Sequence, residues 1–520
     1  MTDFVSILDQ YAHCQPQKLA LRAEGHDWDY AALADASRRA ASVLQQQGVA
    51  AGDRIALFCY NTPAFVFALF GAWRLGATVV PINHKLQAPE LAYILRHSGA
   101  TLCLFDAALA EVVTSCGLAI KPLATGGRAG NIPSFDALCE AATPLMDEAA
   151  PPADAIAEIL YTSGTTGKPK GCLHTHHAVL CTAMAAAAAT SLTHADRTLI
   201  AMPIWHSSPL NNWCLGTLLV GGSVVLLREY APAAFLQTLQ QERITFTFGA
   251  PIAFLAPLQV VDNIADMDFS SMRLWAYGGG PLGADMARRL AAAYRSDRFM
   301  QVYGMTETGP LGTVLHPEDA VTKAGSIGRC GTPGTVVQLR HSDGRPCQAG
   351  EVGEIHLRSP GMMAGYLDDA EATANAFDQH GWYRSGDLAR IDEDGFLFIV
   401  DRLKDMIVTG GENVYSKEVE DAIAAHPAVQ DVAVIGRPHP EWGETVTALL
   451  VLRPGQTLDT QGLQDFLAPR LARYKIPRIV QVCESLPRTA TGKLLKHLLR
   501  NEGTLRAPAT QAAGQADGQA

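Results

Sequence analysis

The chain has 520 residues, 48% of them hydrophobic, and a formal net charge of −11. This length is enough for two or more domains, and the composition is typical of a globular protein. The negative balance disfavours a protein that binds nucleic acid with its whole surface. No membrane span is expected, because the best candidate, residues 65–81, is short and interrupted by Arg74.

The N-terminus and the cysteines favour a cytoplasmic protein. The stretch MTDFVSILDQ has no basic segment of the kind that opens a signal peptide, and Phe4, Ile7, Leu8 and Tyr11 predict a helix capped by Asp3. The eleven cysteines are scattered without a C-x-x-C pair. This pattern argues against a zinc ribbon or a disulfide framework and for a reducing compartment.

The first half of the chain predicts alternating strands and helices. Strands are expected at 54–60, 77–82 and 101–105, and helices at 63–75 and 89–97. The apolar run 218–227 is interpreted as a buried strand, and the alternation continues with a helix at 235–242 and a strand at 244–249. This order predicts an α/β fold with mostly parallel sheets and flanking helices.

The pattern changes after about residue 332, where turn signals separate short apolar runs and predict a small β-rich unit. A helix beginning at Ser416 and later strand-like runs predict a small, mobile α+β domain. The expected boundaries are 1–402 for the large N-terminal domain, 403–503 for the C-terminal domain and 504–520 for a disordered tail.

The stretch YTSGTTGKPKG, residues 161–171, follows an apolar strand and is rich in Gly, Ser, Thr and Lys. Backbone N–H groups, hydroxyls and lysines in this arrangement could hold a triphosphate. The spacing differs from that of a Walker P-loop, because Pro169 follows Lys168 and Thr162 stands in place of the first glycine. The alternative for such a stretch alone is a flexible surface turn.

Three further stretches could carry chemistry. In QVYGMTETGP, Glu307 could bind Mg²⁺, although a solvated acid is the commoner case. In the stretch around YRSGD, Asp387 could accept hydrogen bonds from a ribose diol, and Arg402 could bridge ribose and phosphate; the alternative is a structural ion pair. Lys493, in a turn before a helix, could reach across a domain interface or could simply be an exposed lysine.

In this order and spacing, these elements resemble the adenylate-forming enzymes, which include acyl- and aryl-CoA synthetases, luciferases and peptide-synthetase adenylation domains. The resemblance runs from about residue 2 to residue 500. Its motifs here are YTSGTTGKPKG, YGMTE, GEIHLRSPGMMAGY, YRSGD, DRLKDMI and PRTATGK.

The resemblance implies an ATP site and a catalytic set. The β- and γ-phosphates would be held by Thr162, Ser163, Gly164, Thr165, Thr166, Gly167 and Lys168. The adenine and acyl carboxylate side would be lined by Gly278, Gly279 and Gly280, and adenine would be flanked by Gln301, Tyr303 and Gly304. Further roles are α-phosphate contact for Thr306, Mg²⁺ binding for Glu307, ribose contact for Asp387 and Arg402, and bridging of the acid and the α-phosphate for Lys493.

The same resemblance implies the second half of the reaction. His206 in WHSSPL would gate the path between the acyl pocket and the thiol tunnel, Gly410 and Gly411 would lie along pantetheine, and Lys404 would be the hinge. Many CoA synthetases have Asp at the hinge, and some have lysines facing CoA where Thr409 and Gly410 stand here. Ser385 replaces a usual Thr.

The implied activity is ATP-dependent conversion of a carboxylic acid to acyl-AMP and then to acyl-CoA, with Mg²⁺ as cofactor. The alternatives are transfer of the acyl group to a carrier protein or an amine, and a nucleotide-binding homologue without activity. WHSSPL has no acid that would hold an α-amine and no Lys or Arg for a second carboxylate, which favours a medium-chain, cyclic or aromatic acid; long-chain fatty acid stays open. The partners expected are small molecules, and the sequence leaves a homodimer open.

Two stretches have other interpretations. Cys172 to His177 offers one Cys and three His, but their spacing matches no common zinc pattern. Residues 183–189 are rich in Ala and predict a tightly packed helix. Trp205, Trp213, Trp275, Tyr277 and Phe248 could line an acyl pocket or belong to the core.

Overall fold

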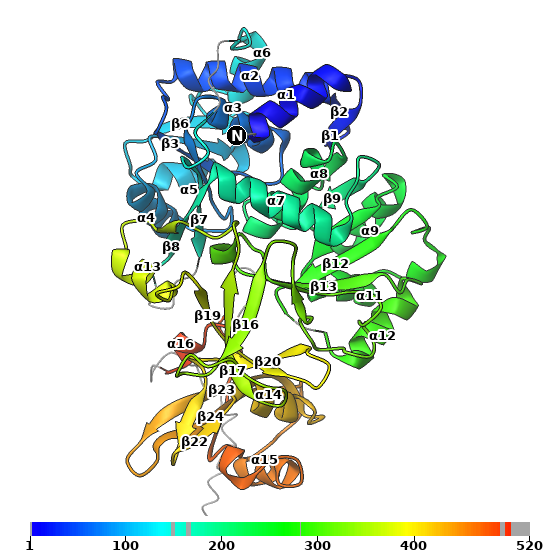
Figure 1. Cartoon of the computed structure of the whole chain (residues 1–520), viewed down its shortest axis with the longest axis vertical. Coiled ribbons are helices and arrows are strands. Elements are labelled where there is room, and N and C mark those ends of the chain that lie inside the picture. Colours follow the sequence, from blue (N-terminus) through cyan, green and yellow to red (C-terminus); the bar gives the residue numbers. More distant parts are fainter. Residues whose placement is uncertain (1–2, 147–150, 163–167, 281, 489–493, 501–520) are drawn as a thin grey trace, which may run out of the picture. The chain divides into compact units, whose positions relative to one another are not determined.

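The computed structural model describes residues 3–146, 151–162, 168–280, 282–488 and 494–500. The chain divides into two compact units (Figure 1). Unit 1 comprises Met1–Gln338, His356–Ser385 and Ile391–Phe398, and unit 2 comprises Leu339–Ile355, Gly386–Arg390 and Ile399–Ala520.

Unit 1 is built on two large sheets, most of whose strands run parallel, as the α/β pattern predicts. The nine-stranded sheet has the order β15-β14-β13-β12-β11-β9-β10-β1-β2. Its strands are β1 (Leu19–Ala23), β2 (His26–Asp29), β9 (Arg197–Ile200), β10 (Ser223–Leu226), β11 (Phe246–Gly249), β12 (Leu274–Gly278), β13 (Phe299–Tyr303), β14 (Thr313–Leu315) and β15 (Cys330–Gly331).

The seven-stranded sheet has the order β18-β8-β7-β4-β3-β5-β6. Its strands are β3 (Arg54–Phe58), β4 (Thr78–Pro81), β5 (Leu102–Asp106), β6 (Lys121–Thr125), β7 (Ile156–Thr162), β8 (Lys170–Thr175) and β18 (Gly365–Tyr366). A four-stranded sheet, β16-β17-β19-β20, contributes residues to both units and consists of β16 (Val336–Arg340), β17 (Val352–Arg358), β19 (Tyr383–Ile391) and β20 (Leu397–Arg402).

Helices cover both faces of these sheets. Those of unit 1 are α1 (Phe4–Cys14), α2 (Tyr30–Gln46), α3 (Pro63–Arg74), α4 (Ala88–Ser98), η1 (Ala107–Leu109), α5 (Ala110–Ser115), α6 (Phe135–Ala141), α7 (His176–Thr190), η2 (Ser208–Cys214), α8 (Leu215–Leu219), α9 (Pro232–Gln241), α10 (Pro251–Leu255), α11 (Pro257–Val260), η3 (Ile264–Asp266), α12 (Ala284–Ala293), η4 (Thr306–Thr308) and α13 (Ala370–Ala376).

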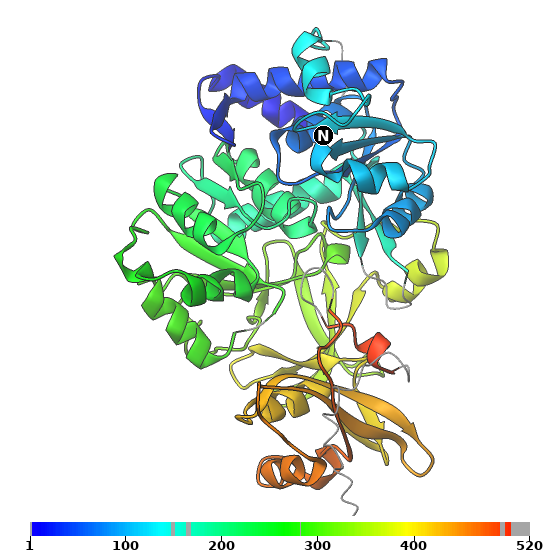
Figure 2. The ribbon, with the colours of Figure 1, turned by 180° about the vertical axis from the view of Figure 1, so that it is seen from behind.

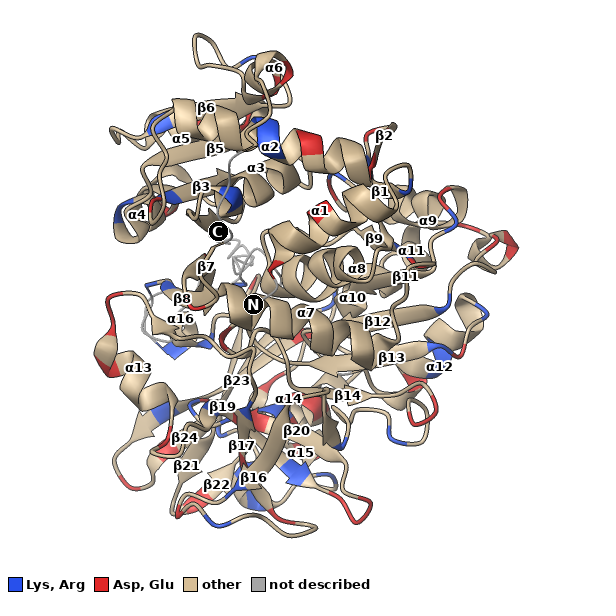
Figure 3. Ribbon diagram, turned by 45° about the horizontal axis from the view of Figure 1, so that its top comes forward, with Lys and Arg blue, Asp and Glu red and all other residues tan. Residues whose placement is uncertain are grey.

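Helix α7 forms a layer between the two large sheets. It packs on β7 and β8 of one sheet and on η2, which in turn contacts β9 of the other. Figure 3 shows α7 without a charged residue, and Ala183, Ala186 and Ala187 are buried. Small side chains allow close approach on the packed faces, whereas Met184 and Ala188 are exposed, so the predicted tightly packed helix is confirmed.

The outer face of the nine-stranded sheet carries its own core, under the green helices α9, α10 and α12 (Figure 2). Trp275 and Tyr277 of β12 point into this core and are almost fully buried there. Trp213 and Phe248 instead belong to the cluster on the inner side of the sheet. Trp275 and Tyr277 are therefore core residues. Trp213 is only 2% exposed and belongs to a core cluster as well, so the half-buried Trp205 and Phe248 of the predicted aromatic set stay candidates for an acyl pocket.

Most predicted boundaries of regular elements agree with the structure within two or three residues. Asp3 caps α1 as expected, since its carboxylate accepts the Ser6 backbone N–H at 2.9 Å. The strand predicted at 218–227 is wrong in its first half, because Leu218 and Leu219 end helix α8 and the chain turns at Gly221, whose φ is 73°. A short apolar run does not distinguish a buried helix end from a strand.

Unit 2 contains the predicted small α+β fold. Its five-stranded sheet has β22-β21-β24-β23 in order, with β25 paired parallel to β24. The elements are β21 (Ile407–Thr409), β22 (Glu412–Val414), α14 (Ser416–Ala424), β23 (Val429–His439), β24 (Gly443–Leu452), α15 (Thr460–Leu467), η5 (Arg473–Lys475), β25 (Ile479–Val482) and α16 (Lys496–Arg500). The predicted tail at 504–520 lies outside the described residues.

None of the helices in the described part of the chain combines the length and the apolar character that a bilayer crossing requires.

Candidate active site

The predicted phosphate loop connects two strands of unit 1. β7 ends at Thr162 and pairs antiparallel with β8, so Thr162 lies opposite Lys170. Lys168 is exposed, and Lys170 forms an ion pair with Asp369 at 3.3 Å. The predicted phosphate ligands between the strands, Ser163, Gly164, Thr165, Thr166 and Gly167, lie outside the described residues. The described ends place the loop at the end of a buried strand, where phosphate loops of α/β proteins occur.

Thr162 and Glu307 lie close to one thiol. Burial raises the pKa of the Cys172 thiol, the negative charge of Glu307 adds to the rise, and a hydrogen bond with Thr162 opposes it. Cys172 is fully buried. Cys172 pairs with Leu160 of β7 on one side and with Tyr366 of β18 on the other, and Tyr366 donates a hydrogen bond to Glu307. The end of the phosphate strand and the turn that carries Glu307 are therefore brought together on either side of Cys172, although they are far apart in the sequence.

The carboxylate of Glu307 is held by a tyrosine that sequence reasoning missed. Tyr366 of β18 donates its hydroxyl hydrogen to Glu307 Oε1 at 3.1 Å. The backbone carbonyl of Glu307 also accepts the Met363 N–H at 3.0 Å. No described Lys or Arg forms an ion pair with this carboxylate. Its position is fixed, and its charge is available to a cation.

Thr306 lies beside the segment that carries His206. The hydroxyls of Thr306 and Ser207 are 3.2 Å apart, and either can be the donor. Thr306 opens the short helix η4, which ends at Gly309 with a φ of 78°. A Cβ at Gly309 would lie 2.1 Å from the carbonyl oxygen of Gly361, so only glycine fits this turn.

His206 belongs to a chain of aromatic contacts. Its ring stacks on Trp205 with centroids 4.6 Å apart, and Trp205 Nε1 donates to His84 Nδ1 at 3.1 Å. Burial lowers the pKa of both histidines to about 4, so both are neutral at physiological pH. A neutral ring suits a gate that must move without carrying a charge into a desolvated pocket.

Burial also lowers the pKa of His176 to about 4, although the charge of Asp3 opposes the shift. An unfolded histidine titrates near 6.5, so below that pH the unfolded chain binds more protons and the folded state loses stability as pH falls towards 4. As pH falls from about 7.5 to about 5, we expect the free energy of unfolding of His176→Gln to rise relative to that of the unchanged protein. Urea unfolding of both proteins at the two pH values measures this, and an unchanged or opposite difference would contradict the assignment.

The glycines predicted on the adenine and acyl side differ in their surroundings. A Cβ on Gly279 or Gly280 would meet nothing within 4 Å, so the backbone there is open to a ligand. A Cβ on Gly304 would lie 2.3 Å from the carbonyl oxygen of Pro310, and one on Gly278 would lie 2.8 Å from that of Val302. These two glycines are required by close packing of the chain itself.

Gln301 and Tyr303 lie on β13 next to these glycines, and the two-residue period of a strand places them on the same face as the buried Phe299. Gln301 is only 2% exposed, and its side-chain oxygen has no hydrogen-bond partner among the described residues. Tyr303 is half-buried. Their predicted contact with adenine stays a prediction.

In unit 2, Asp387 and Arg402 form the predicted pair. Arg402 Nε lies 3.1 Å from Asp387 Oδ1, and Asp387 is buried whereas Arg402 is half-exposed. The N–H of Leu403 donates to the carbonyl of Gly386 at 2.8 Å, which ties the two strands together. The structure therefore contains Asp387 and Arg402 as an ion pair. The half-exposed guanidinium of Arg402 retains N–H groups that can donate to a nucleotide.

Gly410 and Gly411 form the tip of the hairpin between β21 and β22, with φ values of 59° and 84°. Positive φ at both central residues is what a tight two-residue hairpin requires, so glycine is favoured there. The Gly410 N–H donates to the Trp442 carbonyl at 2.9 Å. Lys404, the predicted hinge, is exposed.

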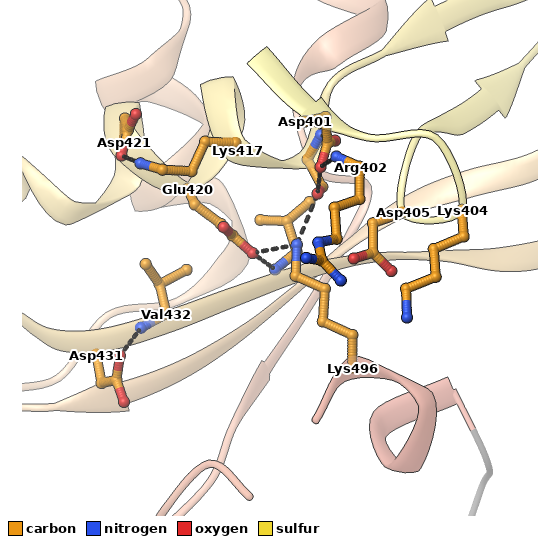
Figure 4. A network of polar contacts seen from close by, with 12 residues as sticks. Asp401, Arg402, Lys404, Asp405, Lys417, Glu420, Asp421, Asp431, Val432 and Lys496 are labelled. Carbon is orange, nitrogen blue, oxygen red and sulfur yellow. Dashed lines mark hydrogen bonds and ion pairs between the residues drawn. The ribbon is translucent and has the colours of Figure 1, made fainter. Parts of the chain in front are cut away.

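Lys493 lies outside the described residues, but the segment just after it is anchored within unit 2 (Figure 4). Lys496 donates to Ser416 Oγ at 2.6 Å and forms an ion pair with Glu420 at 2.7 Å. Arg500 forms an ion pair with Asp405 at 2.9 Å. The C-terminal helix is thereby fixed next to the stretch that contains the predicted hinge.

The metal interpretation of Cys172 to His177 finds no support among the described residues. His174 and His176 are buried, and both have a pKa lowered to about 4 mainly by burial. The group of metal-ligating side chains that does lie close together is His341, Cys347 and Glu351 of unit 2.

Comparison with known proteins identifies the family of the chain. The family model of the AMP-binding enzymes matches residues 8–367, and that of their C-terminal domain matches residues 418–493. A feruloyl-CoA synthase of Amycolatopsis is 38% identical over 491 residues, which cover 94% of this chain and 96% of the relative. A long-chain-fatty-acid–CoA ligase of Mycobacterium tuberculosis is 36% identical over 482 residues, 92% of this chain and 94% of the relative.

Among solved structures, o-succinylbenzoate CoA synthetase of Bacillus subtilis in complex with ATP and magnesium has a TM-score of 0.84 and 31% identity, covering 95% of this chain and 99% of that one. The chain therefore belongs to the adenylate-forming AMP-binding enzyme family, and it is an AMP-forming carboxylate–CoA ligase. Its substrates are ATP, CoA and a small-molecule carboxylic acid.

Proposed function

We propose that Thr162, the following loop as far as Lys168, and the turn of Thr306 and Glu307 form the adenylation site for ATP and the acid. The observation that carries the proposal is that Cys172 of β8 lies between β7, which ends at Thr162, and Tyr366, which holds Glu307, while the hydroxyl of Thr306 contacts that of Ser207. It assembles hydroxyls and a carboxylate at the end of a strand, where a phosphate chain fits.

The chemistry requires such a site because a carboxylate does not accept a thiol, since its oxide leaving group is too basic. Attack of the carboxylate on the α-phosphorus of ATP releases pyrophosphate and forms a mixed anhydride whose leaving group is AMP. Charge develops on the α-phosphate in this step, and preorganised donors stabilise it. Thr306 supplies one such donor, and Lys493 supplies the other.

Glu307 is the residue that would hold Mg²⁺. Its carboxylate is oriented by Tyr366 and has no described basic partner, which fits a cation that is bound by one protein carboxylate and by phosphate oxygens. When bound, Mg²⁺ neutralises charge on the phosphates. The relative solved with ATP and magnesium supports this role.

On the nucleoside side, Gly279 and Gly280 leave space for a ligand, and Gln301, Tyr303 and Gly304 follow on the next strand. Asp387 accepts the ribose hydroxyls, and Arg402 orients Asp387 from 3.1 Å.

The second step uses the same site after a movement of the C-terminal domain. We place the boundary after Arg402, with residues 1–402 and 403–503 as the two domains and Lys404 as the hinge. Lys493 leaves after adenylation, and the loop of Gly410 and Gly411 then lies along pantetheine while His206 opens the acyl side.

The acid is medium-chain, cyclic or aromatic. Phe248 and Trp213 pack with ring centroids 5.6 Å apart on the inner side of the nine-stranded sheet, and residues 204–214 contain no Lys or Arg. An apolar aromatic surface without a cation favours an uncharged acyl group. The named relatives act on feruloyl and long-chain fatty acyl groups, so a long-chain acid is the second candidate.

A panel of acids tests this assignment. We expect pyrophosphate release with ATP to be fastest for cyclic, aromatic or medium-chain acids, and the mass of the product to be that of the CoA thioester. A preference for C16 and longer acids would overturn the substrate class. If pyrophosphate is released but the acyl group is transferred only after a carrier protein or an amine is added, and not to CoA, the assignment of CoA as the acyl acceptor would be overturned.

The eleven cysteines are all free thiols, and five of them are buried. Free thiols persist in reducing compartments, so we place the enzyme in the cytoplasm.

A further inference from the structure

Three side chains that can bind a metal ion gather in unit 2, at residues that neither half-reaction uses. His341, Cys347 and Glu351 each offer one ligand atom, and these three atoms all lie within 4.8 Å of one another. His341 Nε2 and Glu351 Oε2 are 3.0 Å apart. In the described part of the chain, no other group of three or more His, Cys, Asp or Glu side chains meets this criterion.

Two successive turns in the connection between β16 and β17 set the positions of these residues. His341 opens the first turn, in which its carbonyl accepts the Gly344 N–H at 2.9 Å. Glu351 closes the second, in which its N–H donates to the Gln348 carbonyl at 3.1 Å. Cys347 lies between the turns, and its N–H donates to a carbonyl of β16 at 2.9 Å. The backbone therefore holds the three residues together before a ligand arrives, which lowers the ordering cost of binding.

The side chains are positioned as well. A Cβ on Gly353 of β17 would overlap Cys347 Sγ, so the thiol occupies the space that a side chain at this position would fill. Glu351 Oε2 accepts the Gln348 N–H at 2.6 Å. The side chains of His341 and Glu351 are 26% and 44% exposed, so an ion can reach them from solvent.

The charges around the thiol favour a cation between these side chains. Hydrogen bonds from the Gln348 N–H and from His341 lower the pKa of Glu351, so its carboxylate is ionised at neutral pH. Burial raises the pKa of the Cys347 thiol, and the charge of Glu351 adds to the rise, whereas Arg345 opposes it. Arg345 is itself paired with Asp343 at 2.8 Å. A bound cation would offset the repulsion between thiolate and carboxylate.

A sulfur, an imidazole nitrogen and a carboxylate oxygen are the donors that Zn²⁺ takes in proteins. With metal–ligand distances of about 2.0 to 2.3 Å, tetrahedral geometry separates the ligand atoms by about 3.3 to 3.6 Å. The three atoms can reach these separations by small side-chain movements. Mg²⁺ prefers oxygen ligands and keeps several waters, so a site with a thiol does not suit it.

We propose that His341, Cys347 and Glu351 form a binding site for Zn²⁺, with a fourth position open to water. The thiolate is the ligand, so binding releases the Cys347 proton to solvent. The ion would join the two turns between β16 and β17. This site belongs to unit 2, whereas Glu307, the proposed magnesium ligand, belongs to unit 1.

Cobalt(II) reports on the sulfur ligand, because it can replace Zn²⁺ at such sites and its bond to a thiolate gives a charge-transfer band in the near ultraviolet. Full-length, reduced enzyme is first freed of metal with a chelator and then titrated with Co²⁺. The band should appear and saturate at one ion per chain. Zn²⁺ should then abolish it, whereas an excess of Mg²⁺ should leave it in place.

Two variants and a matched control assign the site. Cys347→Ser removes the sulfur and should abolish the band. Glu351→Gln keeps an oxygen for the Gln348 N–H but loses the charge, so it should weaken Co²⁺ binding by more than the 10- to 100-fold that loss of an outer partner costs. Cys330→Ser, which removes an exposed thiol of unit 1, should leave the band unchanged. Circular dichroism checks that each variant is folded.

The absence of the band from folded, unchanged enzyme at saturating Co²⁺ would overturn the proposal, and so would a band that persists in Cys347→Ser. A band lost equally in Cys330→Ser would show that cobalt is held elsewhere. Glu307→Gln should keep the band. Because these measurements use neither ATP nor an acid, a failure of the proposed adenylation site would be recognised separately, by the absence of pyrophosphate release from the unchanged enzyme.

Discussion

Replacing Lys493 by Ala lowers the rate of acyl-adenylate formation by about a hundredfold or more, because it removes a preorganised cation from the α-phosphate as negative charge develops there. Thioester formation from pre-made acyl-AMP and CoA largely survives, because Lys493 has left the site in that step. Pyrophosphate release measures the first half-reaction, and CoA consumption with synthetic acyl-AMP measures the second.

Lys417→Ala is a control for the loss of a lysine from the same unit, since Lys417 is half-exposed and paired with Asp421 within α14. It should leave both half-reactions unchanged. Equal losses of the two half-reactions in Lys493→Ala would refute the role assigned to Lys493 and the domain movement inferred from it.

Replacing Glu307 by Gln lowers adenylation by about a hundredfold or more at ordinary magnesium concentrations, since the amide keeps the shape of the side chain but removes the negative charge that would hold Mg²⁺. Higher magnesium restores part of the rate. The measurement is the dependence of pyrophosphate release on magnesium concentration at saturating ATP and acid.

Tyr366→Phe provides the graded comparison, because it leaves the carboxylate in place and removes only the hydroxyl that orients it from 3.1 Å. Loss of such a partner costs about 10- to 100-fold in metal affinity, so the magnesium dependence should shift without disappearing. A Glu307→Gln enzyme with unchanged magnesium dependence would show that the cation is held elsewhere.

The helices and strands were predictable where the residues that start and end an element agree with its hydrophobic periodicity. Pro63 and Gly76 bound a helix that the structure places at Pro63–Arg74, and the uncharged, Ala-rich run after His176 is a helix packed on both sides. At 218–222 the same reasoning failed, because apolar residues without a period leave helix and strand equally plausible. Only packing against α7 decides that this segment is the end of a helix.

The motifs allow a candidate site to be proposed residue by residue, but they do not indicate the residues that support it. Tyr366 is distant from Glu307 in the sequence, and the contact of Ser207 with Thr306 depends on how η2 packs between two sheets. Such pairs arise from tertiary structure alone. Glu158 of β7, which is buried and accepts a hydrogen bond from Asn211 at 2.6 Å, did carry a signal in the sequence, a single acid within the apolar run AIAEIL, because an acid in a buried strand requires a partner.

The most direct test of the central claim, that the enzyme activates an acid by forming acyl-AMP, is the exchange of labelled pyrophosphate into ATP. The account predicts exchange that requires a cognate acid and magnesium and proceeds without CoA. Folded, magnesium-replete enzyme that exchanges no label with any acid of the panel would contradict it.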